Sequence, residues 1–444
     1  MIQEHDELVD NYSQDIHFII GRAGCGKSTL LAKQVKELGM DTIVLTPTHK
    51  AKDVLLAKGL VQVFTIHSVL KLVPTIDENF RKRGKLQKLR RIGELKLDHI
   101  KHIIIDEYSM VSSEILDILL DVLPPYAKVT IYGDSSQLPT VDGTVIDPYF
   151  YTAEEKITTL TTQHRSEAPE VVEAFMRFAD YVATGDSRID LRLDFKGTLK
   201  KGSIFSFNHE TDRILAYTNE RVIQLNNQVA KHLNLPSEIS IGEQVLINGL
   251  IGTLVSSKGI NDNDIVYTIY PKCVAKGKLM HGDTLIDTIE SIEADIETYN
   301  QQLHHAKVYY IEIEDEVYRM YGDIQHYKHS KDFKQGVEDA QLDLIAEYSL
   351  GDDVDLKQYC RQNKNSHTKA RGRAWSSFLG HQGLVWDIRR PFCTTVHKSQ
   401  GQEFERVFID QTDIKKSIRG GYYEQYARLM YVAMSRAIKG VIIL

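Results

Sequence analysis

Gly21-Arg-Ala-Gly-Cys-Gly-Lys-Ser28 decides the fold of this 444-residue chain. The stretch follows an apolar run, Phe18 to Ile20, and precedes an expected helix that ends near Gly39. A strand, a glycine-rich loop and a helix in this order form a phosphate-binding loop, because backbone N–H groups, a helix N-terminus and a lysine all present positive charge to an anion. The sequence therefore predicts a site for a nucleoside triphosphate.

Cys25 lies inside this loop, and two interpretations of it stay open. A helix N-terminus would lower the pKa of its thiol, so that alkylation inhibits the protein. Alternatively, the cysteine is a small residue that fills a tight turn. The other cysteines are Cys273, Cys360 and Cys393, and none shows C-x-x-C spacing. We therefore expect reduced thiols, with neither a zinc site nor a disulfide framework.

The composition is that of an ordinary globular protein, with 42% hydrophobic and 26% charged residues, and the length allows about three domains. No apolar run is long enough to span a membrane. Glu4, Asp6 and Glu7 stand where a targeting peptide would carry basic residues. We therefore expect a cytoplasmic protein with no membrane partner.

The net charge of −7 does not by itself indicate a nucleic-acid partner. A local basic run differs from this average, because no acidic residue interrupts it. The run contains Arg81, Lys82, Arg83, Lys85, Lys88, Arg90 and Arg91. Two interpretations stay open, namely contact with phosphate groups and a solvated surface loop.

Short apolar segments alternate with helical periods between residues 16 and 160. Strands are predicted over 17–20, 42–45, 102–105, 129–132 and 157–160. Such alternation favours an α/β fold with a mostly parallel sheet covered by helices on both faces. Ligand chemistry then gathers at the carboxyl ends of the strands.

A second α/β unit follows, and an insertion is predicted to split it. Helices are expected over 168–183, 219–231 and 422–435, and strands over 213–217, 392–396, 406–409 and 441–444. Between 241 and 386 the pattern is β-rich and polar instead, with strands expected over 243–247, 264–270 and 307–312.

Polar residues follow two of the predicted strands in the first unit. Asp106 can hold Mg²⁺ beside a phosphate loop, and Glu107 can accept a proton from an attacking water. Gln137 can orient that water next to the γ-phosphate. Arg165 and Arg436 can add positive charge to phosphoryl transfer, and this assignment depends on their context.

That context is a family resemblance. It rests on Gly21 to Ser28, Leu45-Thr-Pro-Thr-His-Lys-Ala51, Thr65-Ile-His-Ser68, Asp106-Glu-Tyr-Ser109, Gly133 to Pro139, Gln163-His-Arg165, Thr395-Val-His-Lys-Ser-Gln-Gly-Gln-Glu403 and Tyr431 to Ala437. In this order the motifs resemble those of superfamily 1 helicases. The segments Ala216-Tyr-Thr-Asn219 and Arg373-Ala-Trp-Ser-Ser-Phe378 make the chain similar to the RecD-like branch, and within it to the Dda-type helicases of T-even phages.

The resemblance implies two RecA-like P-loop NTPase domains, with ATP and Mg²⁺ in the cleft between them. Catalytic roles fall on Lys27, Asp106, Glu107, Gln137, Arg165 and Arg436. Nucleotide contacts fall on Gly21, Gly24, Gly26, Lys27, Ser28, Thr29, Gln400, Gly401 and Glu403, with Ser28 and Asp106 as the metal ligands. Contacts to the nucleic acid fall on Thr48, His49, Thr65, His67, Thr395, His397 and Lys398. The family also carries an adenine-reading glutamine upstream of the phosphate loop, a pattern that neither Gln3 nor Gln14 fits.

The resemblance also implies the division of the chain. Domain 1A comprises 1–68 and 99–166, and 69–98 forms a hairpin insertion, 1B, that acts as a pin. Domain 2A comprises 167–240 and 387–444, and 241–386 forms the β-rich insertion 2B. Phe80, at the head of the basic run, is expected to be the wedge residue at a DNA fork, because an aromatic side chain can stack on a base.

We therefore predict an ATP-dependent DNA helicase that translocates 5′ to 3′ on single-stranded DNA, in a bacterial or phage-infected cytoplasm. Its expected partners are single-stranded and fork DNA, together with single-strand-binding or replication proteins, and the expected state is a monomer. Two alternatives stay open: a nucleoprotein-remodelling protein that uses ATP as a switch, and an RNA helicase. A small-molecule kinase would need neither paired domains nor the motif from Thr395 to Glu403.

Overall fold

The computed structural model describes residues 14–70, 72–75, 88–91, 100–140, 146–164, 167–236, 239–247, 250–259, 307–313, 316–322 and 388–444. The backbone divides into two compact units. The first comprises Met1–Val73, Arg90–His232 and Phe392–Leu444, and the second comprises Pro74–Leu89 and Leu233–Pro391. Both parallel sheets formed by the described residues lie in the first unit.

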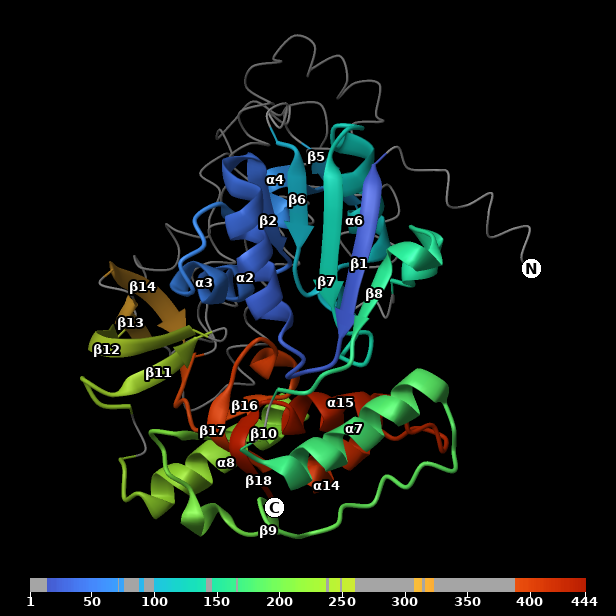
Figure 1. The fold of residues 1–444 in the computed structure, drawn as a ribbon. Coiled ribbons are helices and arrows are strands. Elements are labelled where there is room, and N and C mark those ends of the chain that lie inside the picture. Colours follow the sequence, from blue (N-terminus) through green and yellow to red (C-terminus); the bar gives the residue numbers. More distant parts are fainter. Residues whose placement is uncertain are drawn as a thin grey trace, which may run out of the picture. The chain divides into compact units, whose positions relative to one another are not determined.

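The first sheet has six strands in the order β3-β2-β6-β7-β1-β8, and every pair is parallel (Figure 1). The strands are β1 (Asp15–Gly21), β2 (Thr42–Thr46), β3 (Val63–Thr65), β6 (His102–Ile105), β7 (Lys128–Gly133) and β8 (Ile157–Leu160). All five predicted strands of this region are confirmed. The structure adds β3, which is only three residues long.

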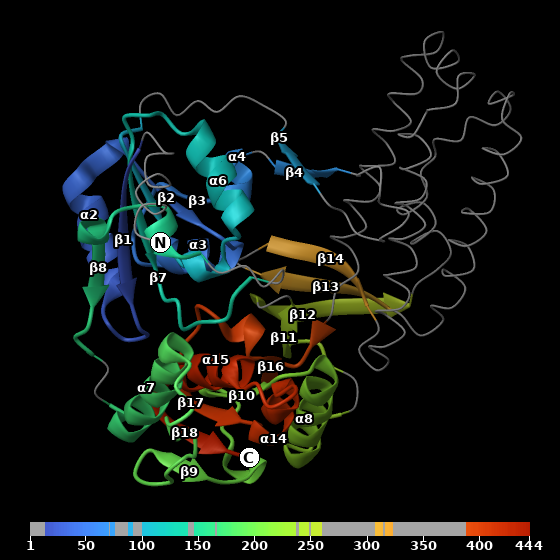
Figure 2. The same cartoon turned by 90° about the vertical axis from the view of Figure 1, so that its right-hand side faces the viewer.

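Helices cover both faces of this sheet, as Figure 2 shows for α2 on one side and α4 and α6 on the other. The helices are α2 (Lys27–Leu38), α3 (His49–Ala57), α4 (Ile66–Leu70) and α6 (Ser113–Val122). Leu31 of α2 and Leu55 of α3 share one core with Val44 and Ile104. On the other face of the sheet, α4 and α6 pack against the same strands. Because both faces are covered, every residue of β2 is buried.

The second sheet has five strands in the order β16-β10-β17-β18-β9, again with every pair parallel. The strands are β9 (Leu199–Lys201), β10 (Asp212–Ala216), β16 (Cys393–Thr395), β17 (Phe404–Ile409) and β18 (Ala437–Ile443). Two parallel sheets with helices confirm the predicted α/β class.

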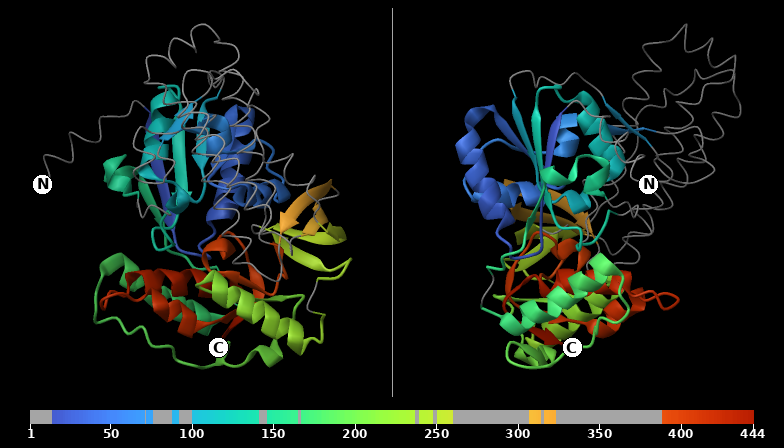
Figure 3. Two further views of the ribbon diagram at one scale, coloured as in Figure 1. Left: turned by 180° about the vertical axis from the view of Figure 1, so that it is seen from behind. Right: turned by 45° about the vertical axis from the view of Figure 1, so that its right-hand side comes forward.

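The helices of this second sheet are α7 (Pro169–Thr184), α8 (Asn219–His232), α14 (Gln411–Ile414) and α15 (Glu424–Met434). In Figure 2, α7 and α8 lie on opposite sides of the strands. The aromatic rings of Phe175 and Phe178 on α7 meet Tyr431 and Tyr426 on α15 edge-on. In the view from behind in Figure 3, the yellow-green helix is α8. Its Asn226 exchanges hydrogen bonds with the backbone of Cys393 in β16.

The second unit contains an antiparallel sheet in the order β14-β13-β12-β11-β15. Its strands are β11 (Gln244–Ile247), β12 (Leu250–Gly259), β13 (Lys307–Ile313), β14 (Glu316–Gly322) and β15 (Ile388–Arg389). Val245, Leu254 and Ile311 belong to its core. The strands predicted over 243–247 and 307–312 are present, whereas 264–270 lies outside the described residues.

Several short elements complete the description. β4 (Leu72–Thr75) and β5 (Lys88–Arg91) form a two-stranded sheet. The 3₁₀ helices are η1 (Gly39–Asp41), η2 (Tyr108–Met110), η3 (Pro148–Phe150), η4 (Glu154–Lys156), η5 (Ile204–Ser206), η6 (His397–Ser399) and η7 (Lys415–Ser417).

Candidate functional site

The phosphate loop connects β1 to α2 and depends on glycine at two positions. Gly24 and Gly26 have φ values of +85° and +78°, a region that favours glycine because it lacks a Cβ. A Cβ on Gly24 would also meet Oε1 of Gln163 at 2.1 Å. The loop therefore has the predicted strand, turn and helix geometry, and its backbone N–H groups lie at the amino end of α2.

Lys27 is the first residue of α2, and Ser28 and Thr29 complete that turn. The Nζ of Lys27 donates hydrogen bonds to the carbonyl oxygens of Gly21 and, at 3.1 Å, of Arg22. The amine thus lies over the loop, where a phosphate ligand would meet it. Cys25 is buried, at 5% exposure, so the structure favours a residue that fills the turn over a reactive thiol.

Asp106 directly follows β6, and its N–H donates to the carbonyl of Leu45 at 2.9 Å. Its carboxyl group is buried and forms no ion pair with any described residue. Burial, followed by the charge of Glu107, raises its pKa to about 7. Glu107 has a φ of +56°, which strains a residue with a side chain and directs it away from the usual strand geometry. A buried carboxyl that forms no ion pair within the described part of the chain suits a site for Mg²⁺.

A chain of hydrogen bonds joins Glu107, Gln137 and Gln400. The amide of Gln137 donates to Glu107 at 3.3 Å, and the amide of Gln400 donates to Gln137 at 3.5 Å. Gln137 lies in the loop after β7, whereas Gln400 precedes β17 of the second sheet. Three of the predicted residues from two sheets therefore meet directly.

Arg436 and the segment Gln400-Gly401-Gln402-Glu403 also lie together. Gly401 has a φ of +74°, and the following carbonyl, of Gln402, accepts a hydrogen bond from Arg436 at 3.3 Å. The guanidinium further donates to Val432 and Ser435 on α15 and its end. Glu403 is exposed. Arg436 is thus buried against this segment within the second sheet.

Arg165 lies outside the described residues, but the two residues before it contact the phosphate loop. The amide of Gln163 donates to the carbonyl of Ala23 at 2.8 Å. The N–H of His164 donates to the carbonyl of Gly24 at 3.0 Å. The chain is therefore fixed to the phosphate loop as far as His164.

Sequence reasoning assigned no role to the residues that tie α15 to the first sheet. Arg428 donates to the carbonyls of Ser135 and Gln137 at 2.6 and 2.7 Å. The hydroxyl of Tyr431 donates to Asp134 and accepts from the N–H of Ala23 at 2.7 Å. Arg428 and Tyr431 are three residues apart and so share a helix face. The only sequence signal for this contact was the three-residue spacing of two polar side chains shortly before Arg436.

The predicted nucleic-acid residues of the first sheet follow β2 and β3, which are neighbours. Thr48 caps α3 by accepting the N–H of Ala51 at 3.2 Å. Thr65 ends β3, and its hydroxyl accepts the N–H of Ser68 at 3.3 Å. His67 is exposed, and desolvation of its ring lowers its pKa. His49 is the first residue of α3.

The predicted residues of the second sheet form a parallel arrangement. Thr395 ends β16, and its hydroxyl accepts the N–H of Lys398 at 3.3 Å. Beside it, β10 ends in register with Thr395 and leads to Tyr217, whose ring centroid lies 6.1 Å from that of His397. Desolvation lowers the pKa of His397. Thr395, His397 and Lys398 therefore stand at the carboxyl edge, as Thr65 and His67 do.

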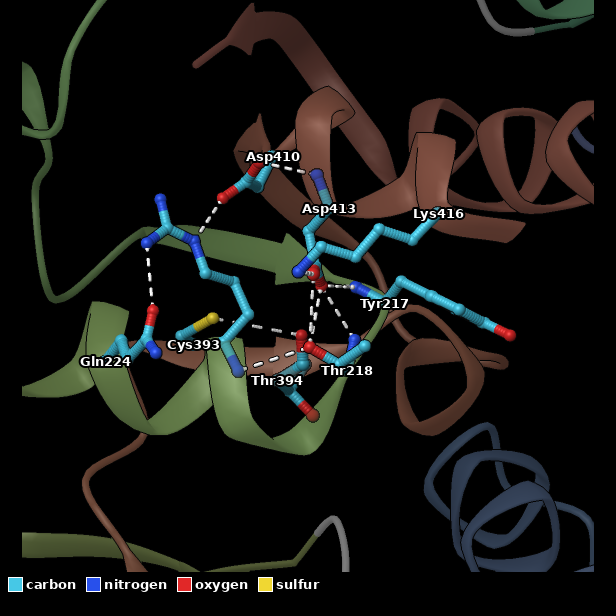
Figure 4. A network of polar contacts seen from close by, with 9 residues as sticks. Tyr217, Thr218, Gln224, Cys393, Thr394, Asp410, Asp413 and Lys416 are labelled. Carbon is cyan, nitrogen blue, oxygen red and sulfur yellow. Dashed lines mark hydrogen bonds and ion pairs between the residues drawn. The ribbon is translucent and has the colours of Figure 1, made fainter. Parts of the chain in front are cut away.

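A polar network next to this edge was not predicted. The Asp413 carboxylate accepts the N–H groups of Tyr217 and Thr218 at 2.9 and 2.7 Å, and Lys416 donates to it at 2.7 Å (Figure 4). Arg221 donates to Asp410 at 2.5 Å. The network fixes the turn after β10 and so the position of Tyr217.

The remaining residues considered in the sequence lie outside the described part of the chain or away from the phosphate loop. Phe80, with the basic run as far as Lys85, lies outside the described residues, as do Gln3 and the segment from Arg373 to Phe378. Gln14 is described, and its amide donates to the carbonyls of Leu120 and Leu123. It therefore fastens the end of α6 at the amino end of β1, far along the strand from the phosphate loop.

Comparison with known proteins agrees with this geometry. A model of the AAA domain matches residues 7–194, and a model of the UvrD-like helicase C-terminal domain matches residues 392–444. The ATP-dependent DNA helicase dda of Enterobacteria phage T4 is 25% identical over 455 residues, which cover 94% of this chain and 92% of that protein. The chain thus resembles the superfamily 1 helicases.

Two further helicases are also similar. The ATP-dependent RecD2 DNA helicase of Deinococcus radiodurans is 29% identical over 180 residues, 39% of this chain and 23% of that protein. Among solved structures, Bacteroides Pif1 bound to single-stranded DNA has a TM-score of 0.48 at 15% identity, with 99% of this helicase and 91% of that chain covered. The predicted resemblance to the Dda type is confirmed. None of the described helices is long and apolar enough to cross a bilayer.

Proposed function

We propose that this helicase uses ATP to translocate along single-stranded DNA and to separate the strands of a fork. The observation that carries the proposal is the hydrogen-bonded chain from Glu107 through Gln137 to Gln400. It joins the carboxylates beside the phosphate loop to the segment before β17. A change at the nucleotide can therefore reach the second sheet through three side chains.

The proposed hydrolysis uses residues of both sheets. Amides of the phosphate loop, from Gly21 to Gly26, and the Lys27 amine bind the phosphates of ATP. Mg²⁺ held by Ser28 and Asp106 would neutralise charge that develops on those phosphates. Glu107 accepts the proton of the attacking water, and Gln137 orients that water. Additional phosphate and coupling contacts come from Thr29, Arg165, Gln400, Gly401, Glu403 and Arg436.

The proposed path of the DNA runs along the carboxyl edges of both sheets. Short polar side chains there suit phosphate and sugar groups, which position a strand without reading its sequence. Binding should therefore be sensitive to salt and tolerant of sequence. The contacts come from Thr48, His49, Thr65, His67, Thr395, His397 and Lys398.

The predicted division into domains 1A, 1B, 2A and 2B also belongs to the proposal. Segment 69–98 would act as the pin with Phe80 as its wedge, and segment 241–386 would guide the strand. Charge reversal at Arg83, Lys85 and Lys88 should then weaken unwinding more than ATP hydrolysis. Equal loss of both activities would contradict a pin.

Strand displacement on partial duplexes with a single-stranded 5′ or 3′ tail, with a trap strand present, tests activity and polarity together. We expect unwinding only from the 5′ tail, and none with Lys27→Ala. Unwinding from the 3′ tail would overturn the polarity, and DNA-stimulated hydrolysis without unwinding would favour a remodelling protein. RNA tails decide the substrate class, because an RNA helicase would prefer them. Light scattering tests the expected monomer.

A further inference from the structure

The hydroxyl of Tyr431 bonds to two parts of the nucleotide site at once. It accepts the backbone N–H of Ala23, in the phosphate loop, at 2.7 Å. It donates to the carboxylate of Asp134, at the start of the loop that carries Gln137. Tyr431 itself belongs to α15, three residues before the last residue of the helix and five before Arg436. One oxygen atom therefore joins three elements.

These bonds are shielded from water, which makes their geometry costly to change. Tyr431 has 0% and Asp134 1% exposure. The second oxygen of Asp134 accepts the N–H of Ser136 at 2.9 Å, so the carboxylate cannot turn without losing a bond. Arg428, one helical turn earlier, donates to the carbonyls of Ser135 and Gln137. Hydrogen bonds to α15 therefore hold the loop after β7 both at Asp134 and at Gln137.

We propose that Tyr431 is a positioning residue that sets the phosphate loop, the Gln137 loop and α15 in the register that hydrolysis requires. The inference rests on the proposed function, because it concerns the same nucleotide site. Gln137 must lie at a fixed distance from the γ-phosphate, and its backbone carbonyl is bound to α15 while its side chain meets Glu107. Ala23 fixes the phosphate end of that distance, Asp134 fixes the Gln137 end, and the Tyr431 hydroxyl joins the two.

Removal of the hydroxyl should disturb the reaction more than ATP binding. In Tyr431→Phe the ring still packs against Phe175, but the Ala23 N–H loses its acceptor and Asp134 loses one of its two donors. The phosphate contacts of Lys27 and of the other loop amides do not depend on that oxygen. Small displacements of a reacting group lower a rate steeply, whereas ground-state binding tolerates them.

The test compares Tyr431→Phe with Tyr426→Phe in DNA-stimulated ATP hydrolysis by the full chain. Tyr426 is a matched control, since it lies on the same helix at 4% exposure and its hydroxyl accepts from Gln411 at 2.8 Å, away from the phosphate loop. We expect Tyr431→Phe to lower kcat about tenfold with a change in KM for ATP below about threefold, and Tyr426→Phe to change kcat less than about twofold. Equal kcat values in the two variants would overturn the inference.

Asp134→Asn tests the same contact from its other side and keeps the assay decisive if Tyr431→Phe folds poorly. It should lower kcat by a similar factor, and the double variant should be no slower than the slower single variant within about twofold, because both remove one interaction. Multiplicative losses would contradict a shared contact. A wild-type protein without DNA-stimulated hydrolysis would overturn the proposed function and this inference together, whereas an active wild type with an unaffected Tyr431→Phe overturns the inference alone.

Discussion

The two parallel sheets have the same strand order but use their carboxyl edges differently. Read along each sheet, β3-β2-β6-β7-β1 corresponds to β16-β10-β17-β18-β9, with β8 added to the first. The corresponding strands also follow one another along the chain in the same order. The central strands, β6 and β17, are each followed by an aspartate. Asp106 after β6 donates its N–H to Leu45, and Asp410 after β17 donates its N–H to Leu215. The two aspartates therefore occupy equivalent positions.

Their environments are opposite. Asp106 forms no ion pair with a described residue, and burial raises its pKa to about 7. Asp410 pairs with Arg221 and caps α14 by accepting the N–H of Asp413. Burial also acts to raise the pKa of Asp413, but hydrogen bonds from Lys416, Thr218 and Tyr217 outweigh it, and the net shift is downward. At one edge a buried carboxyl has no ion pair among the described residues, and at the other edge carboxylates stabilise a turn.

The largest expected effect separates the residues that follow the two aspartates. Glu107→Gln should lower kcat for ATP hydrolysis by about 10²–10⁴, because the proposed general base is lost. Gln411 holds the matching position after Asp410, and Gln411→Ala should change kcat less than about threefold. Steady-state ATPase assays with single-stranded DNA measure both. A comparable loss of kcat in Gln411→Ala would contradict the view that the first edge carries the chemistry and the second edge is structural.

The next effect concerns stability at the second edge. Asp413→Ala removes the acceptor of two backbone N–H groups and the partner of Lys416, so it should lower the free energy of unfolding by about 2–4 kcal/mol. Urea unfolding measures this, and Asp121→Ala, an exposed acid on α6, is the control. If Asp413→Ala lowered the free energy of unfolding no more than the control does, the network would not stabilise the fold.

The two edges should also respond to pH in opposite directions. The folded pKa of Asp106 is about 7 against a usual 3.8, so its carboxyl costs stability as pH rises through that range. Asp106→Asn should therefore stabilise the fold by about 1–2 kcal/mol above pH 7 and have little effect near pH 4. Because the pKa of Asp413 is lowered, its stabilising effect is present above its usual pKa of 3.8 and is lost as pH falls below that value.

Thermal unfolding of Asp106→Asn and wild type at several pH values measures the first of these effects. If the stability gained by Asp106→Asn did not increase with pH, other contacts would be offsetting the cost of burying the Asp106 carboxylate. Loss of ATP hydrolysis in the same variant, together with the gain in stability, would mark the residue as one retained for chemistry.

The smallest expected effect lies at the margin of the phosphate loop. Arg22 pairs with Asp180 of α7 at 2.6 Å, with the two side chains 26% and 51% exposed. Solvent screens such a pair, so Asp180→Asn should cost less than about 1 kcal/mol and change KM for ATP only slightly, mainly at low salt. Titration of KM against salt concentration measures it. A large change in KM that persists at high salt would instead indicate that α7 contributes directly to nucleotide binding.

The sequence predicted the long elements and the residues within local motifs. The strands around the phosphate loop and Asp106 could be found because each is a continuous apolar run with a polar residue at its end. β3 and β9, three residues each, are too short to show a periodic pattern. The correspondence of the two sheets stayed hidden because an insertion separates β10 from β16.

Pairs distant in sequence could not be predicted. Thr218 and Asp413 are 195 residues apart, and Asp134 and Tyr431 are 297 apart. No local pattern links such residues, because each alone is an ordinary turn or helix residue. Tyr431 was part of a recognised motif, but only the folded chain brings its hydroxyl to Ala23.

The insertion in the second sheet also has a consequence for synthesis of the chain. Asn226 and Cys393 are hydrogen-bonded although 167 residues separate them, and β16 must join β10 across the same gap. At about 5–20 residues per second, a ribosome needs roughly 10–30 s to supply the missing strand. The first sheet can close meanwhile, since its six strands end by Leu160. Both neighbours of β10, namely β16 and β17, follow the insertion, so the nascent second sheet waits with both edges of β10 unpaired. Unpaired strand edges are prone to aggregation until their partners are synthesised.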